Sequence, residues 1–162
     1  MVKIRRLMEK DINRIIEIEK ESFEYSYPPT LIRQLYISFP DGFLVAEDSN
    51  GNIMGYVIAT MEWGNGHIVS IAVGKNYRNK GVGALLLNAI EDYLFKKCNA
   101  KYIVLEVRFD NINARKFYYK KGYEDKRLLS EYYDDGSDAI LMVKKNPYLE
   151  SNNYYPIIVN MW

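Results

Sequence analysis

The sequence is poor in cysteine and histidine, carries almost no net charge and contains no long hydrophobic run. Its single cysteine, Cys98, excludes intrachain disulfides and fits a reducing cytosol; with no histidine nearby, it is a packing residue rather than an acyl-enzyme nucleophile. A net charge of +1 gives no reason to expect nucleic-acid binding. No stretch approaches the ~20 apolar residues of a membrane span, and no apolar run follows residues 1–6 as in a signal peptide. We therefore expect a cytoplasmic protein without nucleic-acid or membrane partners.

The length of 162 residues is enough for one domain with a sizeable core. We assign this domain to residues 1–145. Residues 146–162, rich in Tyr, Asn and Pro, form a C-terminal tail to which the sequence assigns no role. A monomer and a homodimer are both compatible with the sequence.

The most informative segment is a glycine-containing loop between a strand and a helix. A β-branched strand, residues 70–73, leads through a basic loop to Gly81 and Gly83, and apolar residues then recur at the spacing of an amphipathic helix over 82–97. The first N–H groups of a helix lack internal partners and carry partial positive charge, while Arg78 and Lys80 add full charges. This arrangement predicts a pyrophosphate site. The alternative is an ordinary strand–turn–helix corner with solvated basic residues.

The glycine spacing excludes two common phosphate motifs. A dinucleotide fingerprint requires a third glycine where this chain has Leu86, and a P-loop requires Gly-Lys-Ser/Thr, which is absent. The motif that remains is Arg-x-x-Gly-x-Gly, formed by Arg78, Gly81 and Gly83.

The periodicity along the chain predicts alternating strands and helices. We expect strands at 2–6, 42–47, 53–62, 67–73, 102–108, 123–129 and 139–144. Candidate N-caps for the other helices are Asp11, Thr30 and Asn113. Asn50-Gly51 and Asn65-Gly66 are predicted turns. The order β-α-α-β-β-β-α-β-α-β-β predicts an α/β fold, a mixed sheet covered by helices on both faces.

The loop and the element order together resemble the GNAT family of N-acetyltransferases, over residues 2–144. Four further strings resemble its N-terminal protein acetyltransferase branch, of the archaeal Ard1 and bacterial RimI type: residues 66–73, 105–108, 113–123 and 132–139. In the third string the spacing is Asn-Ala rather than Asn-x-x-Ala, so the match rests on Phe117-Tyr118 and Gly122-Tyr123. The resemblance implies an acetyl-CoA-dependent N-α-acetyltransferase. It implies direct attack in a ternary complex with a protein or peptide N-terminus.

The same resemblance implies where acetyl-CoA binds. Backbone groups of one strand would pair with the pantetheine amides: Ile71, Ala72 and Val73. Backbone N–H groups of the loop would hold the pyrophosphate: Arg78, Asn79, Lys80, Gly81, Val82, Gly83 and Ala84. Besides capping its helix, Asn113 would contact the pantetheine arm.

Three residues are candidates for proton transfer. Glu106 is a carboxylate within an otherwise apolar strand, where it is costly unless it has a function or a partner, and the strand alone is equally compatible with a base and with a structural pair with Arg108. The resemblance of residues 105–108 to the RimI-type string implies that Glu106 is the base. His67, the single histidine, is expected beside Glu106, where the two could share one water. Its alternative is a structural role, as a turn residue or a hydrogen-bonded side chain that fills space. Tyr118 is the candidate acid for the departing sulfur, and its alternative is core packing. His67 and Glu106 are too few for a metal site, so we expect none.

Four tyrosines are candidates for the walls of a peptide groove: Tyr25, Tyr27, Tyr132 and Tyr133. Loop packing is their alternative role. Ard1-like enzymes carry a glutamate in the first of these loops, whereas this chain has Glu24 one place earlier and Tyr25 at the matching position, which is closer to the RimI type. An acetyltransferase for lysine side chains or small amines, and a non-catalytic CoA-binding or ribosome-associated module, remain the alternative functions.

Overall fold

The computed structural model describes residues 1–149, and their strands form one seven-stranded sheet in the order β1-β2-β3-β4-β5-β7-β6. The strands are β1 (Lys3–Arg6), β2 (Phe43–Glu47), β3 (Ile53–Glu62), β4 (Asn65–Val73), β5 (Tyr102–Arg108), β6 (Glu124–Leu129) and β7 (Ala139–Lys145). The helices are α1 (Ile12–Ser22), α2 (Pro29–Ser38), α3 (Val82–Asp92) and α4 (Ile112–Lys120), and α3 continues as a π-helical segment, Tyr93–Lys97. The predicted α/β fold is confirmed.

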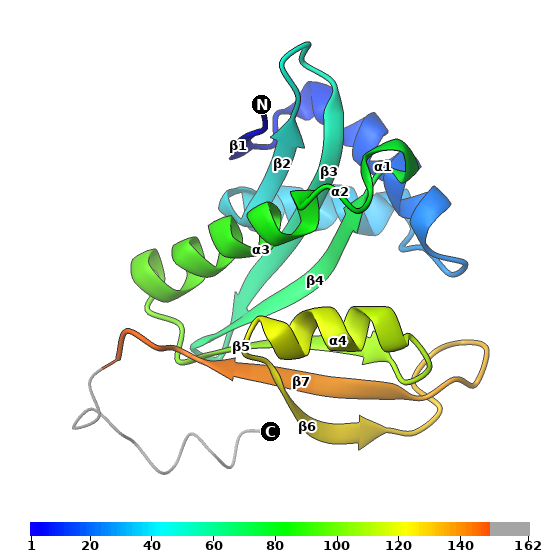
Figure 1. Ribbon diagram of the computed structural model, residues 1–162, viewed down its shortest axis with the longest axis vertical. Helices are drawn as coiled ribbons and strands as arrows, with labels where there is room; N and C mark the ends of the chain where they lie inside the picture. The colour runs from blue at the N-terminus through cyan, green and yellow to red at the C-terminus, as the bar shows by residue number, and fades with distance from the viewer. Residues whose placement is uncertain (150–162) are drawn as a thin grey trace.

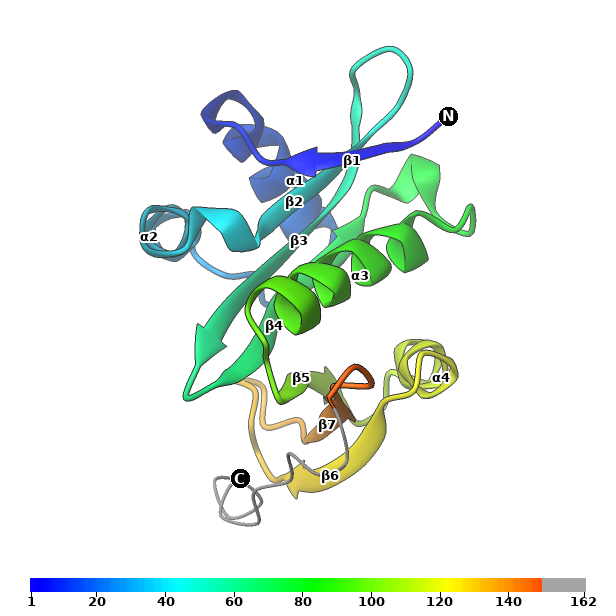
Figure 2. The ribbon, with the colours of Figure 1, turned by 90° about the vertical axis from the view of Figure 1, so that its left-hand side faces the viewer.

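Helices cover both faces of the sheet (Figure 1). In the view turned by 90°, α1 and α2 lie on one side of β2, β3 and β4, and α3 lies on the other side (Figure 2). Helix α4 is on the same side as α3, next to the half of the sheet made by β5, β7 and β6. No helix within residues 1–149 is long and apolar enough to cross a membrane.

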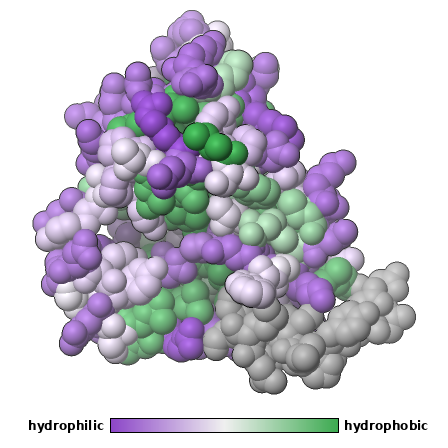
Figure 3. All heavy atoms as spheres, turned by 180° about the vertical axis from the view of Figure 1, so that it is seen from behind, coloured by the Kyte–Doolittle hydropathy of each residue, from purple (hydrophilic) through white to green (hydrophobic). Residues whose placement is uncertain are grey.

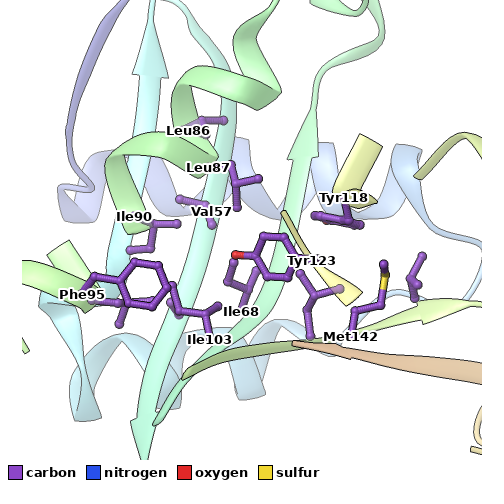
Figure 4. Close-up of a cluster of buried hydrophobic side chains, with 14 of the residues drawn as sticks. Val57, Ile68, Leu86, Leu87, Ile90, Phe95, Ile103, Tyr118, Tyr123 and Met142 are labelled. Carbon is purple, nitrogen blue, oxygen red and sulfur yellow. The ribbon is translucent and has the colours of Figure 1, made fainter. Parts of the chain in front are cut away.

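The sheet separates two hydrophobic clusters. The larger one contains Leu86, Leu87 and Ile90 of α3 together with Ile68 and Ile103 of β4 and β5. Figure 4 shows side chains of this cluster, with the Tyr123 ring among them and Tyr118 of α4 to one side. The second cluster joins α1 and α2 to the opposite face and includes Ile15, Ile18 and Ile32. These clusters hold the two halves of the sheet and their helices in fixed positions.

Strands β4 and β5 are parallel neighbours for only two residue pairs, Gly66 with Ile103 and His67 with Val104. The register between β3 and β4 shifts between Ile58 and Ala59, which is a bulge on the β4 side. A bulge bends its strand and increases the local twist. After His67 the two strands therefore diverge, and the β4 edge that faces β5 lacks pairing from β5.

Several local expectations were wrong. The β3–β4 turn is formed by Trp63 and Gly64, both with positive φ, and Asn65-Gly66 already pairs within the hairpin. The α4 cap is Asn111, whose side chain accepts a hydrogen bond from the Ala114 N–H at 3.1 Å. Asn113 lies inside α4.

The other two expected caps also differ. The Asp11 carboxylate makes no cap bond to α1; it accepts from the Arg5 guanidinium and the Met8 N–H, each at 2.8 Å. Helix α2 begins at Pro29, so Thr30 lies within it; proline suits the first helical position because no partner for its nitrogen is needed there. Residues 150–162 of the expected tail lie outside the described residues, and the domain boundary at 145 stays a prediction.

The face on the side of α1 and α2 mixes hydrophilic and hydrophobic residues (Figure 3). Large side chains with substantial exposure include Tyr25, Tyr27 and Tyr132, at 50%, 37% and 47%. Exposed rings on two separate loops are suited to contact another molecule.

Candidate functional site

A histidine between two carboxylates occupies the place where β4 and β5 separate. His67 Nε2 lies 2.8 Å from Glu106 Oε1, and His67 Nδ1 lies 2.9 Å from Glu62 Oε2. Glu62 lies at the end of β3 and Glu106 lies on β5, so three strands supply the cluster. The side chains of Glu106 and His67 are only 15% and 22% exposed. The structure therefore joins His67 and Glu106 directly, in place of the shared water that we expected.

The two carboxylates change the acid–base behaviour of His67. Burial alone would lower the pKa of the imidazole, but the hydrogen bonds and negative charges of Glu106 and Glu62 outweigh burial and raise its pKa above 6.5. The folded state therefore binds this proton more tightly than the unfolded state. The ion pairs stabilise the fold fully at pH values below the unfolded pKa, and that contribution is lost as the pH rises through the raised folded pKa.

The alternative partner for Glu106, Arg108, has other contacts. Its guanidinium lies 3.1 Å from the Asp135 carboxylate, 4.4 Å from the Tyr133 ring centroid and 5.8 Å from that of Tyr25. Asp135 and Tyr133 belong to the β6–β7 loop and Tyr25 to the α1–α2 loop, so one cation joins two loops that are far apart in the sequence. Sequence reasoning missed this role, although the position of Arg108 at the end of β5 is a signal for it.

Three of the four candidate groove tyrosines, Tyr27, Tyr132 and Tyr133, lie near the Glu106 carboxylate, and Tyr25 lies beside Arg108. Tyr132 and Tyr133 form an edge-to-face pair with centroids 5.0 Å apart. Burial raises the pKa of Tyr27 to about 12, with further contributions from Tyr132, Glu106 and Glu19. Burial also raises the pKa values of Tyr132 and Tyr133, and Glu106 contributes to both. The two loops thus bring phenol groups together around the Glu106 carboxylate.

Tyr118 points from α4 toward the same region. It is 8% exposed, and its ring makes edge-to-face contacts with Phe117 and Tyr123 at 5.2 and 5.6 Å. Burial raises its pKa, and the charge of Tyr133 adds to this effect. Within residues 1–149 the structure records no hydrogen-bond partner for its hydroxyl. The hydroxyl oxygen itself keeps some contact with solvent, so it is free to donate to a bound molecule.

The predicted phosphate loop leads into α3 as expected. Gly81 adopts φ +81°, which only glycine tolerates easily, and the first intrahelical bond runs from the Leu85 N–H to the Gly81 carbonyl. Gly83 needs no special φ, and an added Cβ would make ordinary van der Waals contacts with the Val73 and Phe117 side chains, at 3.8 and 3.9 Å. Packing within the chain therefore does not require glycine at position 83. The smallest residue there keeps the helix N-terminus accessible to an anion such as a pyrophosphate.

The loop cation Arg78 is held by the protein itself. Its Nε donates to the Val73 carbonyl at 2.9 Å, and its Nη2 donates to Ser22 Oγ at 3.1 Å. Arg78 thereby fixes the end of β4 against the end of α1 and places positive charge beside the loop. Asn79 adopts φ +62°.

The strand expected to pair with pantetheine has the required free edge. Ile71, Ala72 and Val73 pair with β3 on one side and have no β5 partner on the other. Asn113 is exposed on the first turn of α4, and its contact with a pantetheine arm stays a prediction. Among residues 1–149 no group of three or more His, Cys, Asp or Glu residues could hold a metal ion.

A second buried carboxylate, Glu19 of α1, escaped the sequence reasoning. It is 1% exposed and accepts hydrogen bonds from the Tyr27 N–H, the Tyr56 hydroxyl and the Ser70 hydroxyl, at 2.8, 2.6 and 2.8 Å. Its position next to Ile18 on the apolar face of α1 was the available signal.

A family model of the acetyltransferase (GNAT) family matches residues 12–123. The chain belongs to the GNAT acetyltransferase family.

The chain is 47% identical to an uncharacterised N-acetyltransferase of Methanocaldococcus jannaschii, over 98% of this chain and 99% of the relative. It is 34% identical to the N-alpha-acetyltransferase of Sulfurisphaera tokodaii, over 86% of this chain and 90% of that relative. The structure of Ard1 from Thermoplasma volcanium superposes with a TM-score of 0.85 at 31% identity, over 92% of this chain and 99% of that one. The predicted family and its Ard1-type branch are confirmed, and GNAT acetyltransferases use acetyl-CoA.

The two contacts of His67 predict its titration. Because the chain has one histidine, NMR of its ring carbons and protons gives an unambiguous signal. We expect a pKa above 6.5 in the wild-type protein, and a lower value in Glu62→Gln, because the neutral amide removes one stabilising charge. Glu17→Gln, on the exposed side of α1, is the control and should leave the titration unchanged. Identical titrations of the wild type and Glu62→Gln would contradict the contact.

Proposed function

We propose that this GNAT enzyme transfers the acetyl group of acetyl-CoA to the N-terminal α-amine of a protein or peptide. The observation that carries the proposal is the Glu106–His67 pair at the separation of β4 and β5, beside tyrosines from two loops that we propose as the walls of a peptide groove. The similarity to archaeal N-alpha-acetyltransferases supports the same substrate class. Direct attack in a ternary complex, without a covalent enzyme intermediate, is the mechanism that these residues support.

An α-amine needs little help from a catalytic base to become a neutral nucleophile. Its pKa of about 7.7–8.0 leaves roughly a tenth in the neutral form at pH 7, whereas a lysine amine with a pKa of about 10.4 is ~0.04% neutral. The Glu106 carboxylate, held by His67, accepts the proton that leaves the amine nitrogen as the new C–N bond forms. The hydrogen bond from His67 at 2.8 Å keeps the carboxylate oriented.

The leaving sulfur requires a proton when its bond to the acetyl carbon breaks. Bound acetyl-CoA supplies the acetyl group as a thioester. Tyr118 is our candidate donor of this proton, because the residue is buried and its hydroxyl has no hydrogen-bond partner among the described residues. Its raised pKa keeps it protonated throughout the neutral range.

The free β4 edge at Ile71, Ala72 and Val73 would hold the pantetheine amides, and N–H groups of residues 78–84 would hold the pyrophosphate. A branched side chain at position 83 would fill the space that the phosphates need. Gly83→Val should therefore reduce acetyl-CoA affinity sharply, measured by calorimetric titration. Asn88→Val places the same branched residue at an exposed position of α3 and should leave affinity unchanged. Wild-type affinity in Gly83→Val would refute this cofactor site.

Two neighbouring tyrosines of α4 provide a test of the general acid. Tyr118→Phe removes the hydroxyl and should lower kcat by ~10²–10⁴-fold, the usual contribution of a positioned acid, with acetyl-CoA affinity nearly unchanged. Tyr119→Phe is the control, since that hydroxyl is exposed and donates to Asp125. Steady-state kinetics on a free-N-terminus peptide decide the comparison. Equal kcat values in both variants would mean that Tyr118 only packs.

The substrate class is tested with a pair of peptides. One has a free N-terminus and no lysine; the other has a blocked N-terminus and one lysine. We expect acetylation of the first only, because the α-amine is far more often neutral near pH 7. Mass spectrometry locates the added acetyl group. Comparable rates on the blocked lysine peptide would favour a lysine or small-amine acetyltransferase, and no CoA release with either peptide would favour a non-catalytic module.

A further inference from the structure

Glu19 is a buried carboxylate without a cationic partner in any recorded contact. Its three donors come from different elements: the Tyr27 N–H from the α1–α2 loop, the Tyr56 hydroxyl from β3 and the Ser70 hydroxyl from β4. A buried charge is costly unless several hydrogen bonds compensate it. The carboxylate is therefore the junction at which α1, the centre of the sheet and the loop are joined.

The two oxygens of Glu19 divide these contacts. Oε1 accepts from both hydroxyls of the sheet, which themselves lie 3.0 Å apart, and Oε2 accepts from the Tyr27 N–H. One side of the carboxylate is thus fixed to the fully buried Tyr56 and to Ser70. The other side holds the backbone of a loop whose side chains are largely exposed.

Tyr27, whose backbone N–H donates to Glu19, is one of the tyrosines of the proposed groove. Tyr132 of the β6–β7 loop and Glu106 both contribute to the raised pKa of Tyr27, so its phenol lies near both of them. Two residues earlier, Tyr25 faces the Arg108 guanidinium. Fixing the Tyr27 backbone therefore fixes one wall of the groove relative to Glu106.

We propose that Glu19 is a positioning residue for the amine substrate: it anchors the Tyr25–Tyr27 wall to the sheet and acts on substrate binding through that wall. This inference rests on the proposed function, in which the two tyrosine loops receive a peptide N-terminus. Loss of the anchor should raise the KM for the peptide, with smaller effects on kcat and on the KM for acetyl-CoA.

The variant must remove the anchor without leaving buried polar groups unsatisfied. Glutamine is unsuitable, because it can turn its carbonyl toward the Tyr27 N–H and its amide toward the two hydroxyls, which also accept. The combination Glu19→Leu, Tyr56→Phe and Ser70→Ala replaces all the side chains of the junction by apolar ones, a change that can be nearly neutral for stability. Ser70→Ala alone is the matched control, since the Tyr27 contact persists.

We expect the triple variant to raise the peptide KM about tenfold, the loss of one hydrogen bond to a charged group. Ser70→Ala should stay near the wild-type peptide KM, and any change in the KM for acetyl-CoA should be much smaller than tenfold in both proteins. Chymotrypsin, which cleaves after exposed aromatic residues, should cut the triple variant faster after Tyr25, because the loop opens more often. An equal rise in both KM values, or the same rise in Ser70→Ala, would overturn the proposal.

A measurement on the wild-type protein covers the case in which the triple variant does not fold. The Tyr27 amide should exchange with solvent more slowly than the neighbouring loop amides; exchange as fast as theirs would overturn the anchor. The proteolysis and exchange readouts do not depend on which amine is acetylated. If the enzyme accepts lysine peptides only, the proposed function fails, and the KM comparison on that substrate still decides the role of Glu19.

Discussion

The separation of β4 from β5 determines where everything else in the site can lie. Parallel strands normally continue side by side, whereas these two pair only at Gly66–Ile103 and His67–Val104. Two features accompany the separation of β4 from β5 beyond these two pairs. The bulge opposite Ile58 and Ala59 bends β4. At Gly66 an added Cβ would lie 2.9 Å from a Leu94 methyl group, so glycine lets the end of the long helix pack directly on the crossing. The result is an open backbone edge on β4 beside the Glu106 carboxylate, whose strand is paired with β7 along its whole length.

The Glu106 carboxylate is stabilised by a hydrogen bond from the only histidine of the chain. Glu106 is mostly buried, and a buried charge requires a partner. His67 serves as this partner, and Glu62 in turn stabilises the protonated imidazole from the outer side. Glu19 shows a different solution, in which three neutral donors compensate the charge and no recorded cation is involved. Glu106 stays linked to a group that can exchange protons, whereas Glu19 has only hydroxyl and amide donors, which suits a fixed structural junction.

The sequence predicted the parts of this structure that depend on local periodicity. Strand β5 has the expected bounds, and its alternation places Glu106 opposite Leu105. The predictions were wrong where the pairing of strands and the path of the backbone, rather than the local sequence, fix the position of a turn or a helix cap. Asn65-Gly66 is a strong turn signal, but the pairing of Met61 with Gly66 moves the turn to Trp63-Gly64. Asn111 and Asn113 are equally good caps in sequence, and only the backbone path after β5 selects the first. Glu19 falls on the apolar face of α1, which marks it as buried, but its partners Tyr56 and Ser70 lie far away in the sequence and are known only from the fold.

The tyrosines near Glu106 stay uncharged over the pH range in which the substrate amine becomes neutral. An α-amine becomes neutral, and therefore nucleophilic, as the pH approaches 8. Over the same range an unperturbed phenol remains protonated with a margin of about two pH units. Burial widens this margin, raising the pKa of Tyr27 to about 12 and those of Tyr118 and Tyr133 further still. The groove therefore gains no negative charge from its phenols where the amine reacts. Glu106 can act as the proton acceptor, and the Tyr118 hydroxyl keeps the proton that the leaving sulfur requires.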